Sequence, residues 1–182
     1  LLVPPHILLS RIEVDGKHIY TLTGDAQPMT PEGQHEMAIA VLEMFSGGEI
    51  MVLAGMSASA ERKEVFSITS CASYRIELES KGVDVRRSEP EAGVIGLAAL
   101  ITALGPLKNV KTSCTIATTL GNSVDPVAAQ LLLETIRKWW DLPLPVPIDA
   151  TERLAQKVRN MQTGNQKDLI SELSESPDSI YM

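Results

Sequence analysis

The sequence has few cysteines and histidines and no long apolar run, so it lacks the features that build disulfide frameworks, metal sites and membrane spans. Its two cysteines, Cys71 and Cys114, are too few for a disulfide framework and indicate a reducing, cytoplasmic compartment. Its three histidines, His6, His18 and His35, have no carboxylate or cysteine at ligand spacing, so we expect no metal site. No apolar run reaches the roughly 18 residues that a membrane-spanning helix needs, so we expect no membrane partner.

Clustered positive charge is also lacking. The formal net charge is -7 at pH 7, and the sequence has no run of Lys and Arg. Nucleic-acid binding needs such clusters, because they displace the counterions of the phosphate backbone. We therefore expect no nucleic-acid partner.

The catalytic signatures that spacing alone reveals are absent: the P-loop, the nucleophile elbow, paired histidines on a helix and Cys-x-x-Cys. A hydrolase would need a nucleophile with a base, and the sequence offers only Ser57, Ser59, Asp25, His35 and Asp125. None of these stands in a specific motif, so we assign no catalytic residue and no cofactor. The sequence favours a protein that is not an enzyme, and an enzyme that uses loop residues stays open as the alternative.

What the sequence does contain is an alternation of strand-like and helix-like patterns. With 182 residues, 44% of them hydrophobic, the chain can bury a core as a single domain. The patterns predict helices near 32–45, 71–81, 93–104, 126–140 and 150–161, and strands near 7–9, 11–14, 17–23, 49–55, 65–69, 83–86 and 110–118. This alternation predicts an α/β fold with a mostly parallel central sheet and helices on both faces.

Two of these strand predictions are specific. The pair Asp15-Gly16 predicts a hairpin with a type I′ turn, because such turns need positive φ angles. The run 49–55 is nearly all apolar and bounded by glycines, which is typical of a strand covered on both faces. We therefore expect residues 50–54 to form a central parallel strand.

The chain divides into three parts. Residues 1–141 form the predicted α/β core. Residues 142–163 comprise a spacer with proline at alternate positions and a C-terminal helix, and residues 164–182 are polar and acidic, which predicts a flexible tail.

The dense loop at residues 24–34 lies where a predicted strand is followed by the first long helix. Thr30 is a candidate N-cap, and Pro31 suits the first helical position. In an open α/β sheet, ligands and partners meet the loops at the carboxyl ends of strands, which makes Gly24, Asp25 and Gln27 candidate binding residues. Side-chain hydrogen bonds that only shape the turn are an equally open reading.

Further candidates follow other predicted strands or precede helices. Ser57 lies just after residues 49–55, and Asp125 is the predicted N-cap of the helix at 126–140. Gly93 and Gly96 precede a helix, where backbone N–H groups could hold an anion, although close packing on the sheet explains these glycines as well.

The sequence ends in Ile180, Tyr181 and Met182, an apolar residue, a tyrosine and a terminal residue. On a flexible tail, such an ending can insert its side chains into a partner's cleft while the carboxylate meets a lysine or backbone donors. Earlier in the chain, Trp139 and Trp140 precede the proline spacer and predict an exposed apolar surface, so we expect a homo-oligomer.

The order of several short blocks resembles the proteasome assembly chaperone 2 family, especially its archaeal and bacterial members. The matching blocks are Pro4-Pro5-His6, residues 23–28 (Thr-Gly-Asp-Ala-Gln-Pro), residues 31–34 (Pro-Glu-Gly-Gln), residues 93–100 (Gly-Val-Ile-Gly-Leu-Ala-Ala-Leu) and residues 124–129 (Val-Asp-Pro-Val-Ala-Ala). The resemblance covers most of residues 1–140.

This resemblance implies a three-layer α/β/α fold like that of nucleoside phosphorylases, oligomeric assembly, and a chaperone that docks on proteasome α subunits. The family docks through a hydrophobic-Tyr-any tail, which Ile180, Tyr181 and Met182 match. The family's first strand and glycine-rich turn are missing ahead of Leu1, and its glycine-rich loop after the strand at 49–55 is here Gly-Met-Ser-Ala-Ser. These departures bear against a nucleotide or small-ligand role for the loops, which stays the alternative.

Overall fold

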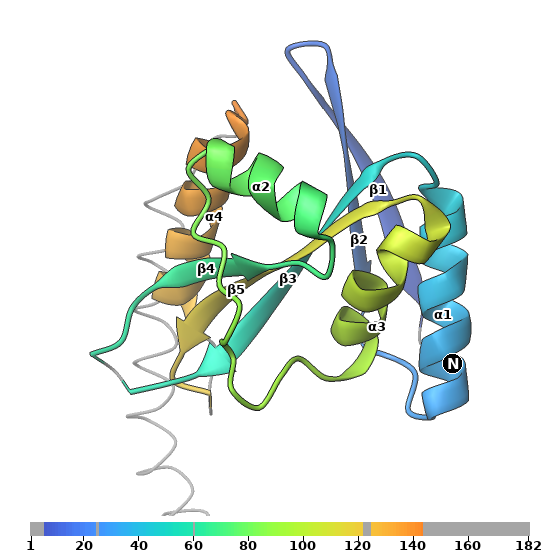
Figure 1. The fold of residues 1–182 in the computed structure, drawn as a ribbon. Coiled ribbons are helices and arrows are strands. Elements are labelled where there is room, and N and C mark those ends of the chain that lie inside the picture. The colour runs from blue at the N-terminus through green and yellow to red at the C-terminus, as the bar shows by residue number, and fades with distance from the viewer. Residues whose placement is uncertain (1–5, 25, 60, 122–124, 144–182) are drawn as a thin grey trace, which may run out of the picture.

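A computed structural model describes residues 6–24, 26–59, 61–121 and 125–143 (Figure 1). Its elements in chain order are β1 (Ile7–Val14), β2 (Lys17–Gly24), α1 (Pro31–Met44), β3 (Glu49–Ser57), β4 (Val65–Ile68), α2 (Ala72–Ser80), α3 (Gly96–Leu104), the 3₁₀ turn η1 (Gly105–Lys108), β5 (Lys111–Thr119) and α4 (Pro126–Trp140). The α/β character predicted from the sequence is confirmed. None of the helices in the described part of the chain is long and apolar enough to cross a membrane.

The strands form two separate sheets. β1 and β2 pair as an antiparallel hairpin, and β3, β5 and β4 form a three-stranded sheet in that order. Within the three-stranded sheet, β3 runs parallel to β5 and β4 runs antiparallel to it. The mostly parallel sheet expected from the sequence is therefore not confirmed in the described residues, because one of the two strand pairs is antiparallel.

The expectation that residues 50–54 form the central strand is wrong for the described residues. β3 has β5 as its one neighbour, and Leu53 is 55% exposed. The central strand is β5, in which Thr112 to Thr118 are all buried. Its buried hydroxyls have partners: the Ser67 and Thr115 hydroxyls lie 2.7 Å apart, and Thr112 Oγ1 donates to Thr102 O. Polar residues can fill a sheet centre when they are hydrogen-bonded in this way.

The hairpin and the first helix lie where the turn and capping residues of the sequence predict them. Asp15 and Gly16 have φ angles of 50° and 74°, as a type I′ turn requires. Thr30 caps α1, since its hydroxyl accepts a hydrogen bond from Gly33 N at 3.1 Å, and Pro31 is the first helical residue. Gly47, at φ 78°, takes the chain from α1 into β3.

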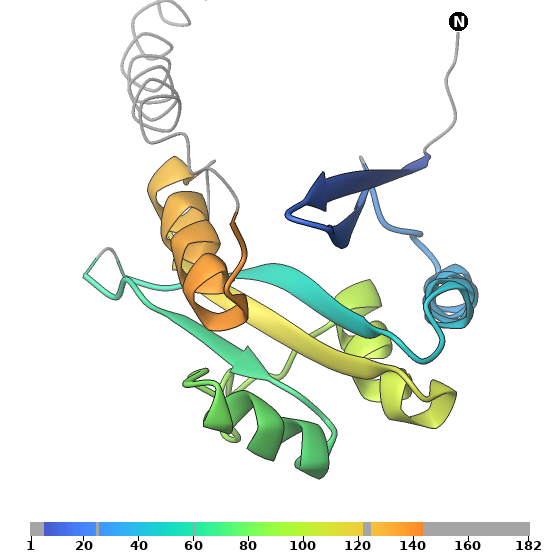
Figure 2. The same ribbon diagram turned by 90° about the horizontal axis from the view of Figure 1, so that it is seen from above.

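Helices lie against both faces of the three-stranded sheet. Figure 2 shows α4 and the hairpin on one face, with α2 and α3 on the other. The largest core cluster joins α1 to α3 and contains Ala38, Leu42 and Ile101. A second cluster, with Phe66, Cys114 and Ile116, lies on the sheet itself.

The two tryptophans do not form the exposed surface expected from the sequence. Trp139 and Trp140 are half-buried and pack against the cluster of Tyr74, Leu78 and Val83 from α2 and the segment after it. The indole N–H of Trp140 also donates to a carboxylate at the start of β3. These contacts hold the end of α4 to the sheet, because they bury apolar surface and satisfy the indole donor.

Candidate functional site

The loops that follow β3 and β5 lie at one end of the sheet. Ser57 pairs with Thr119 at the carboxyl ends of the two parallel strands, and Ala58 N donates to Thr119 O at 2.9 Å. Figure 1 shows these strand ends and the starts of α1 and α3 in the lower half of the view. We call this region the strand-end surface, because it is where α/β folds place ligands and partners.

Gln27 joins the loop before α1 to the start of α3. Its side-chain oxygen accepts a hydrogen bond from Leu97 N at 3.1 Å. Gly96 has a φ of 73°, and a Cβ at this position would lie 2.8 Å from the same Gln27 oxygen. The glycine therefore permits both the left-handed backbone and the close approach of Gln27. A protein oxygen thus fills the place at the α3 N-terminus where an anion could have bound.

Gly24 and Gly93 do not take part in the contact between Gln27 and the start of α3. Gly24 ends β2, and Gly93 lies in a turn with φ 74° in which its N–H donates to Pro90 O at 2.8 Å. A Cβ on Gly93 would meet no atom within 4 Å. Glycine at this position therefore provides the positive φ of the turn and is not needed for close packing. Asp25 lies outside the described residues.

Ser57 packs against the loop that follows β5. Gly121 has a φ of 80°, and a side chain there would overlap the Ser57 hydroxyl. Gly121 N donates to Thr119 Oγ1 at 3.2 Å, so the loop turns directly over the strand end. The structure thus brings Ser57 beside the β5 loop but places it against backbone atoms.

Asp125 carries out the capping role predicted for it. Its carboxylate accepts from Ala128 N at 3.0 Å and pairs with Lys63 Nζ at 2.9 Å, and its side chain is only 8% exposed. Burial raises the pKa of Asp125, but the hydrogen bonds from Lys63 and Ala128 outweigh burial and lower it below its ordinary value. The carboxylate is therefore ionised at neutral pH and already paired within the protein.

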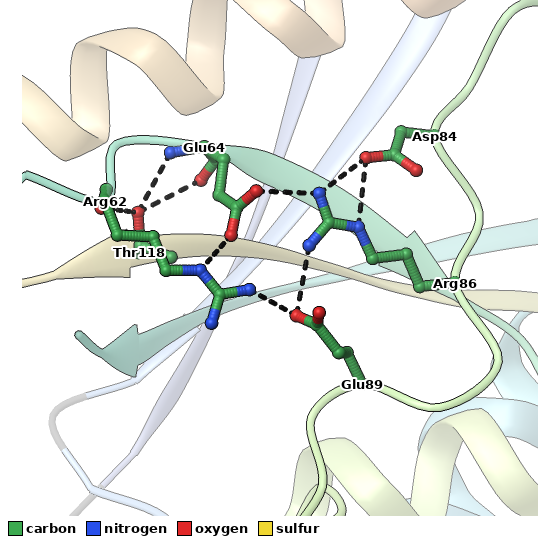
Figure 3. Close-up of polar contacts among 6 residues, drawn as sticks. All are labelled: Arg62, Glu64, Asp84, Arg86, Glu89 and Thr118. Carbon is green, nitrogen blue, oxygen red and sulfur yellow. Dashed lines mark hydrogen bonds and ion pairs between the residues drawn. The ribbon is translucent and has the colours of Figure 1, made fainter.

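A charged network that the sequence did not reveal lies beside this cap (Figure 3). Arg86 donates to Glu64 at 2.8 Å, to Asp84 at 2.9 Å and to Glu89 at 3.0 Å. Arg62 pairs with both Glu64 and Glu89. Two arginines thus connect three carboxylates, which ties the loop before β4 to the segment after α2.

This network is anchored on the sheet. The Arg86 guanidinium lies 4.4 Å from the centre of the Phe66 ring, and Phe66 is fully buried. Thr118 of β5 donates its hydroxyl to Arg62 O at 2.6 Å and accepts from Glu64 N at 3.0 Å. These contacts fix the loop that carries Arg62 and Glu64 against the central strand.

The network perturbs the titration of its members. Hydrogen bonds from Arg86 and then Arg62 lower the pKa of Glu64 to about 2. The Arg62 contact, more than the Arg86 contact, lowers the pKa of Glu89, and hydrogen bonds to Glu64 and Asp84 raise the pKa of Arg86. All these groups stay charged at neutral pH, so the network is a fixed structural feature rather than an acid–base pair near neutrality.

Two large apolar side chains are exposed in the loops that precede α1 and α3. Met29 is 98% exposed just before α1, and Ile95 is 84% exposed just before α3. The hydrogen bond between Gln27 and Leu97 holds their loops together. Contiguous exposed apolar surface is typical of a contact with a partner, so these two joined loops are a candidate contact region.

The described residues contain no group of His, Cys, Asp and Glu that could hold a metal ion. A shallow depression of about 530 Å³ lies away from the strand ends, between the hairpin turn and the end of α4, and is lined by residues that include Asp15, Lys17, Arg137 and Pro143. The predicted tail residues Ile180, Tyr181 and Met182 lie outside the described residues.

Comparisons with known proteins identify similar chains. The sequence profile of the PAC2 family matches residues 1–168. The chain is 22% identical over 149 residues to the uncharacterized protein MJ1210 of Methanocaldococcus jannaschii; this match covers 80% of the chain and 56% of the length of MJ1210.

Two solved structures from Pyrococcus furiosus are similar in fold. PbaA, described as an archaeal homolog of proteasome-assembly chaperone, matches with a TM-score of 0.65 at 18% identity, over 91% of this chain and 76% of PbaA. PbaB, described as an archaeal proteasome activator, matches with a TM-score of 0.65 at 21% identity, over 94% of this chain and 71% of PbaB.

Proposed function

This chain belongs to the PAC2 family, and on that premise we propose that it is a protein-binding assembly factor that docks on proteasome α subunits. The docking element is the C-terminal tail, with Ile180 and Tyr181 filling apolar pockets and the carboxylate of Met182 meeting donors of the partner. The single observation that carries the proposal is the family match over residues 1–168. The names of PbaA and PbaB as a proteasome-assembly chaperone homolog and a proteasome activator support it by analogy.

The packing of the strand-end surface supports a docking protein over an enzyme. Gln27 bonds to the start of α3, and Asp125 bonds to Lys63 and to its own helix. An enzyme site presents convergent polar groups to a substrate, whereas each of these side chains is already hydrogen-bonded to another part of the protein. Of the remaining candidates, Gly93 forms the turn before Ile95 and Gly96 permits the contact with Gln27, so both shape the loop that carries Ile95.

Oligomerisation is part of the proposal. A tail of so few residues binds weakly as one copy, and an oligomer that presents several tails to a ring of equivalent pockets gains affinity through effective concentration. The exposed residues Met29 and Ile95 replace the tryptophans as the apolar surface that could support self-association. A cytoplasmic location and a phosphorylase-like three-layer arrangement of the complete fold also belong to this proposal.

Two changes at the tail test the docking role directly. Tyr181→Ala removes the ring, and an extension of a few residues beyond Met182 moves the carboxylate. We expect each change to abolish capture of purified proteasome α rings, while the circular dichroism spectrum and the oligomeric state measured by light scattering stay as in the wild type. Leu173→Ala is the matched control, because it truncates an apolar side chain in the tail outside the motif and should bind like the wild type.

The alternative function is a phosphorylase-like or hydrolase-like enzyme, or a small-ligand protein, that uses the strand-end loops. It predicts that inorganic phosphate or a nucleoside binds near Gly93, Gly96 and Asp125. Titration of the full chain with each compound, followed by amide chemical shifts, tests this. Saturable shifts centred on these residues would favour the alternative, and their absence together with capture of α rings would support docking.

A further inference from the structure

A segment without helix or strand leads from the edge of the sheet to α3 (Figure 1). We call its residues 87–95 the strap. Just before the strap, Arg86 N donates to Ser67 O of β4 at 2.9 Å. Just after it, Leu97 N donates to the side chain of Gln27. Both ends of the strap are therefore fixed to other parts of the domain.

Between these ends, the backbone of the strap has little support. Within the residues that the structure describes, its one backbone hydrogen bond joins Gly93 N to Pro90 O at 2.8 Å, and both residues belong to the strap itself. Most residues of the strap are exposed. Segments with few buried contacts and few backbone bonds to the core open at a lower cost in free energy than the rest of a domain.

One ionic contact fastens the middle of the strap. Glu89 pairs with Arg62 and accepts from Arg86 at 3.0 Å (Figure 3). No other residue of the strap forms an ion pair in the described part of the chain. Arg62 lies on the loop before β4, which Thr118 of β5 holds through hydrogen bonds to Arg62 O and Glu64 N. Arg62 is thus fixed to the central strand, while Glu89 is carried by the strap.

The strap also covers an apolar face of the sheet. Its residue Val94 packs against the cluster of Phe66, Cys114 and Ile116. Phe66 and Cys114 are fully buried in this cluster. If the strap moves away, Val94 leaves the cluster and part of this cover is lost.

We propose that the strap opens while the rest of the domain stays folded, and that the contacts of Glu89 with Arg62 and Arg86 are its latch. Opening moves Ile95, the last residue of the strap, and uncovers Cys114. The effect on docking rests on the proposed function, because Ile95 belongs to the candidate contact region.

The latch responds to salt rather than to pH near neutrality. Its groups stay charged at neutral pH, because hydrogen bonds between them lower the pKa of Glu89 and raise that of Arg62. The side chains of Arg62 and Glu89 are 40% and 36% exposed, so dissolved ions can screen their attraction. Higher salt should therefore favour the open strap.

The reactivity of Cys114 tests the proposal without any partner, so its outcome is separate from that of α-ring capture. In a Cys71→Ser background, Cys114 is the only cysteine, and a disulfide reagent reaches it only when its cover opens. The rate is measured at urea concentrations that leave the domain folded. Opening of the strap exposes little surface, so we expect a rate that hardly changes with urea there and rises steeply only where the whole domain unfolds.

Glu89→Gln removes both contacts of the latch and leaves Glu64 paired with the two arginines. We expect it to raise the urea-independent rate about two- to fivefold, as for the loss of a surface ion pair. Glu91→Gln is the matched control, because Glu91 is a strap carboxylate without an ion pair among the described residues, and should react like the background protein. An increase in KCl from about 0.05 M to about 0.5 M should raise the rate of the background protein and leave that of Glu89→Gln nearly unchanged.

Two results would overturn the proposal. A Cys114 rate that follows global unfolding at every urea concentration would show that the strap does not open by itself. Equal rates for Glu89→Gln and Glu91→Gln would show that Glu89 does not hold the strap closed. If circular dichroism shows that Glu89→Gln is unfolded, the salt dependence of the background protein decides, and a rate that does not rise with KCl contradicts the latch.

Discussion

Replacement of Arg86 by Gln gives a stability prediction that depends on pH. At neutral pH the side chain donates to Glu64, Asp84 and Glu89 and lies over the buried Phe66 ring. Ion pairs near the surface contribute about 0.2–1 kcal/mol each, and a cation over an aromatic ring contributes about 1 kcal/mol. Because the Arg86 side chain is 24% exposed, we expect Arg86→Gln to lower the free energy of unfolding by about 2 kcal/mol at pH 7.

The sign of the pH dependence follows from Glu64. Its pKa falls from 4.5 to about 2 in the folded protein, so the unfolded chain binds more protons in that range. The stabilisation is complete above pH 4.5 and is lost as the pH falls through 2. The full shift would correspond to roughly 3 kcal/mol, and solvent screening of a partly exposed pair reduces it to about 1 kcal/mol.

Urea unfolding of wild type, Arg86→Gln, Glu64→Gln and the double variant at pH 7 and pH 2.5 measures this contribution. The double-mutant cycle should give a coupling between the two residues of about 1 kcal/mol at pH 7 and a smaller value at pH 2.5. Arg86→Lys is the control, since it keeps the charge and should retain part of the coupling. A coupling near zero at pH 7, or one unchanged at pH 2.5, would refute the assignment of the network as a stabilising feature.

Three further predictions concern single residues. Gln27→Ala removes the oxygen that accepts from the start of α3 and should cost about 1 kcal/mol in urea unfolding, as for other lost helix caps; an unchanged midpoint would contradict the capping role. Cys71 should react with a disulfide reagent at pH 7.5 well before Cys114, because a hydrogen bond with Ser73 lowers the pKa of Cys71 while burial raises that of Cys114 to about 11; equal rates in the folded protein would argue against this. Gly105→Ala should cost about 1–3 kcal/mol, because a Cβ at Gly105 overlaps the buried Thr112 side chain; wild-type thermal stability would show that η1 adjusts freely.

Features determined by neighbouring residues could be predicted from the sequence. The hairpin turn needs only Asp15 and Gly16 in positive φ, and the start of α1 needs only Thr30 and Pro31, so each signal is local. The order of strands is not local. The apolar run of β3 indicated burial on both faces, yet its Leu53 is half exposed and the hydroxyl-rich β5 holds the centre, because partners on other elements satisfy its buried hydroxyls.

The candidate site was predictable only in part for the same reason. Gln27 and Asp125 could be singled out because each lies in a recognisable loop-to-helix position. The network around Arg86 could not, since it depends on the pairs Arg86–Glu64, 22 residues apart, and Arg62–Glu89, 27 residues apart, and no spacing rule predicts such pairs. Charged residues on predicted loops are common, and only the fold brings these particular ones within hydrogen-bond distance.

Capture of proteasome α rings by the full chain and by a version that ends at Asp178 tests the central claim most directly. Both proteins contain every residue that the structure describes, and only the first carries Ile180, Tyr181 and Met182. We expect the full chain to retain α rings and the shortened chain to lose them, with the same oligomeric state in both by light scattering. Equal capture by the two proteins would contradict docking through the tail, and no capture by either would contradict the assembly function and leave the enzyme alternative in front.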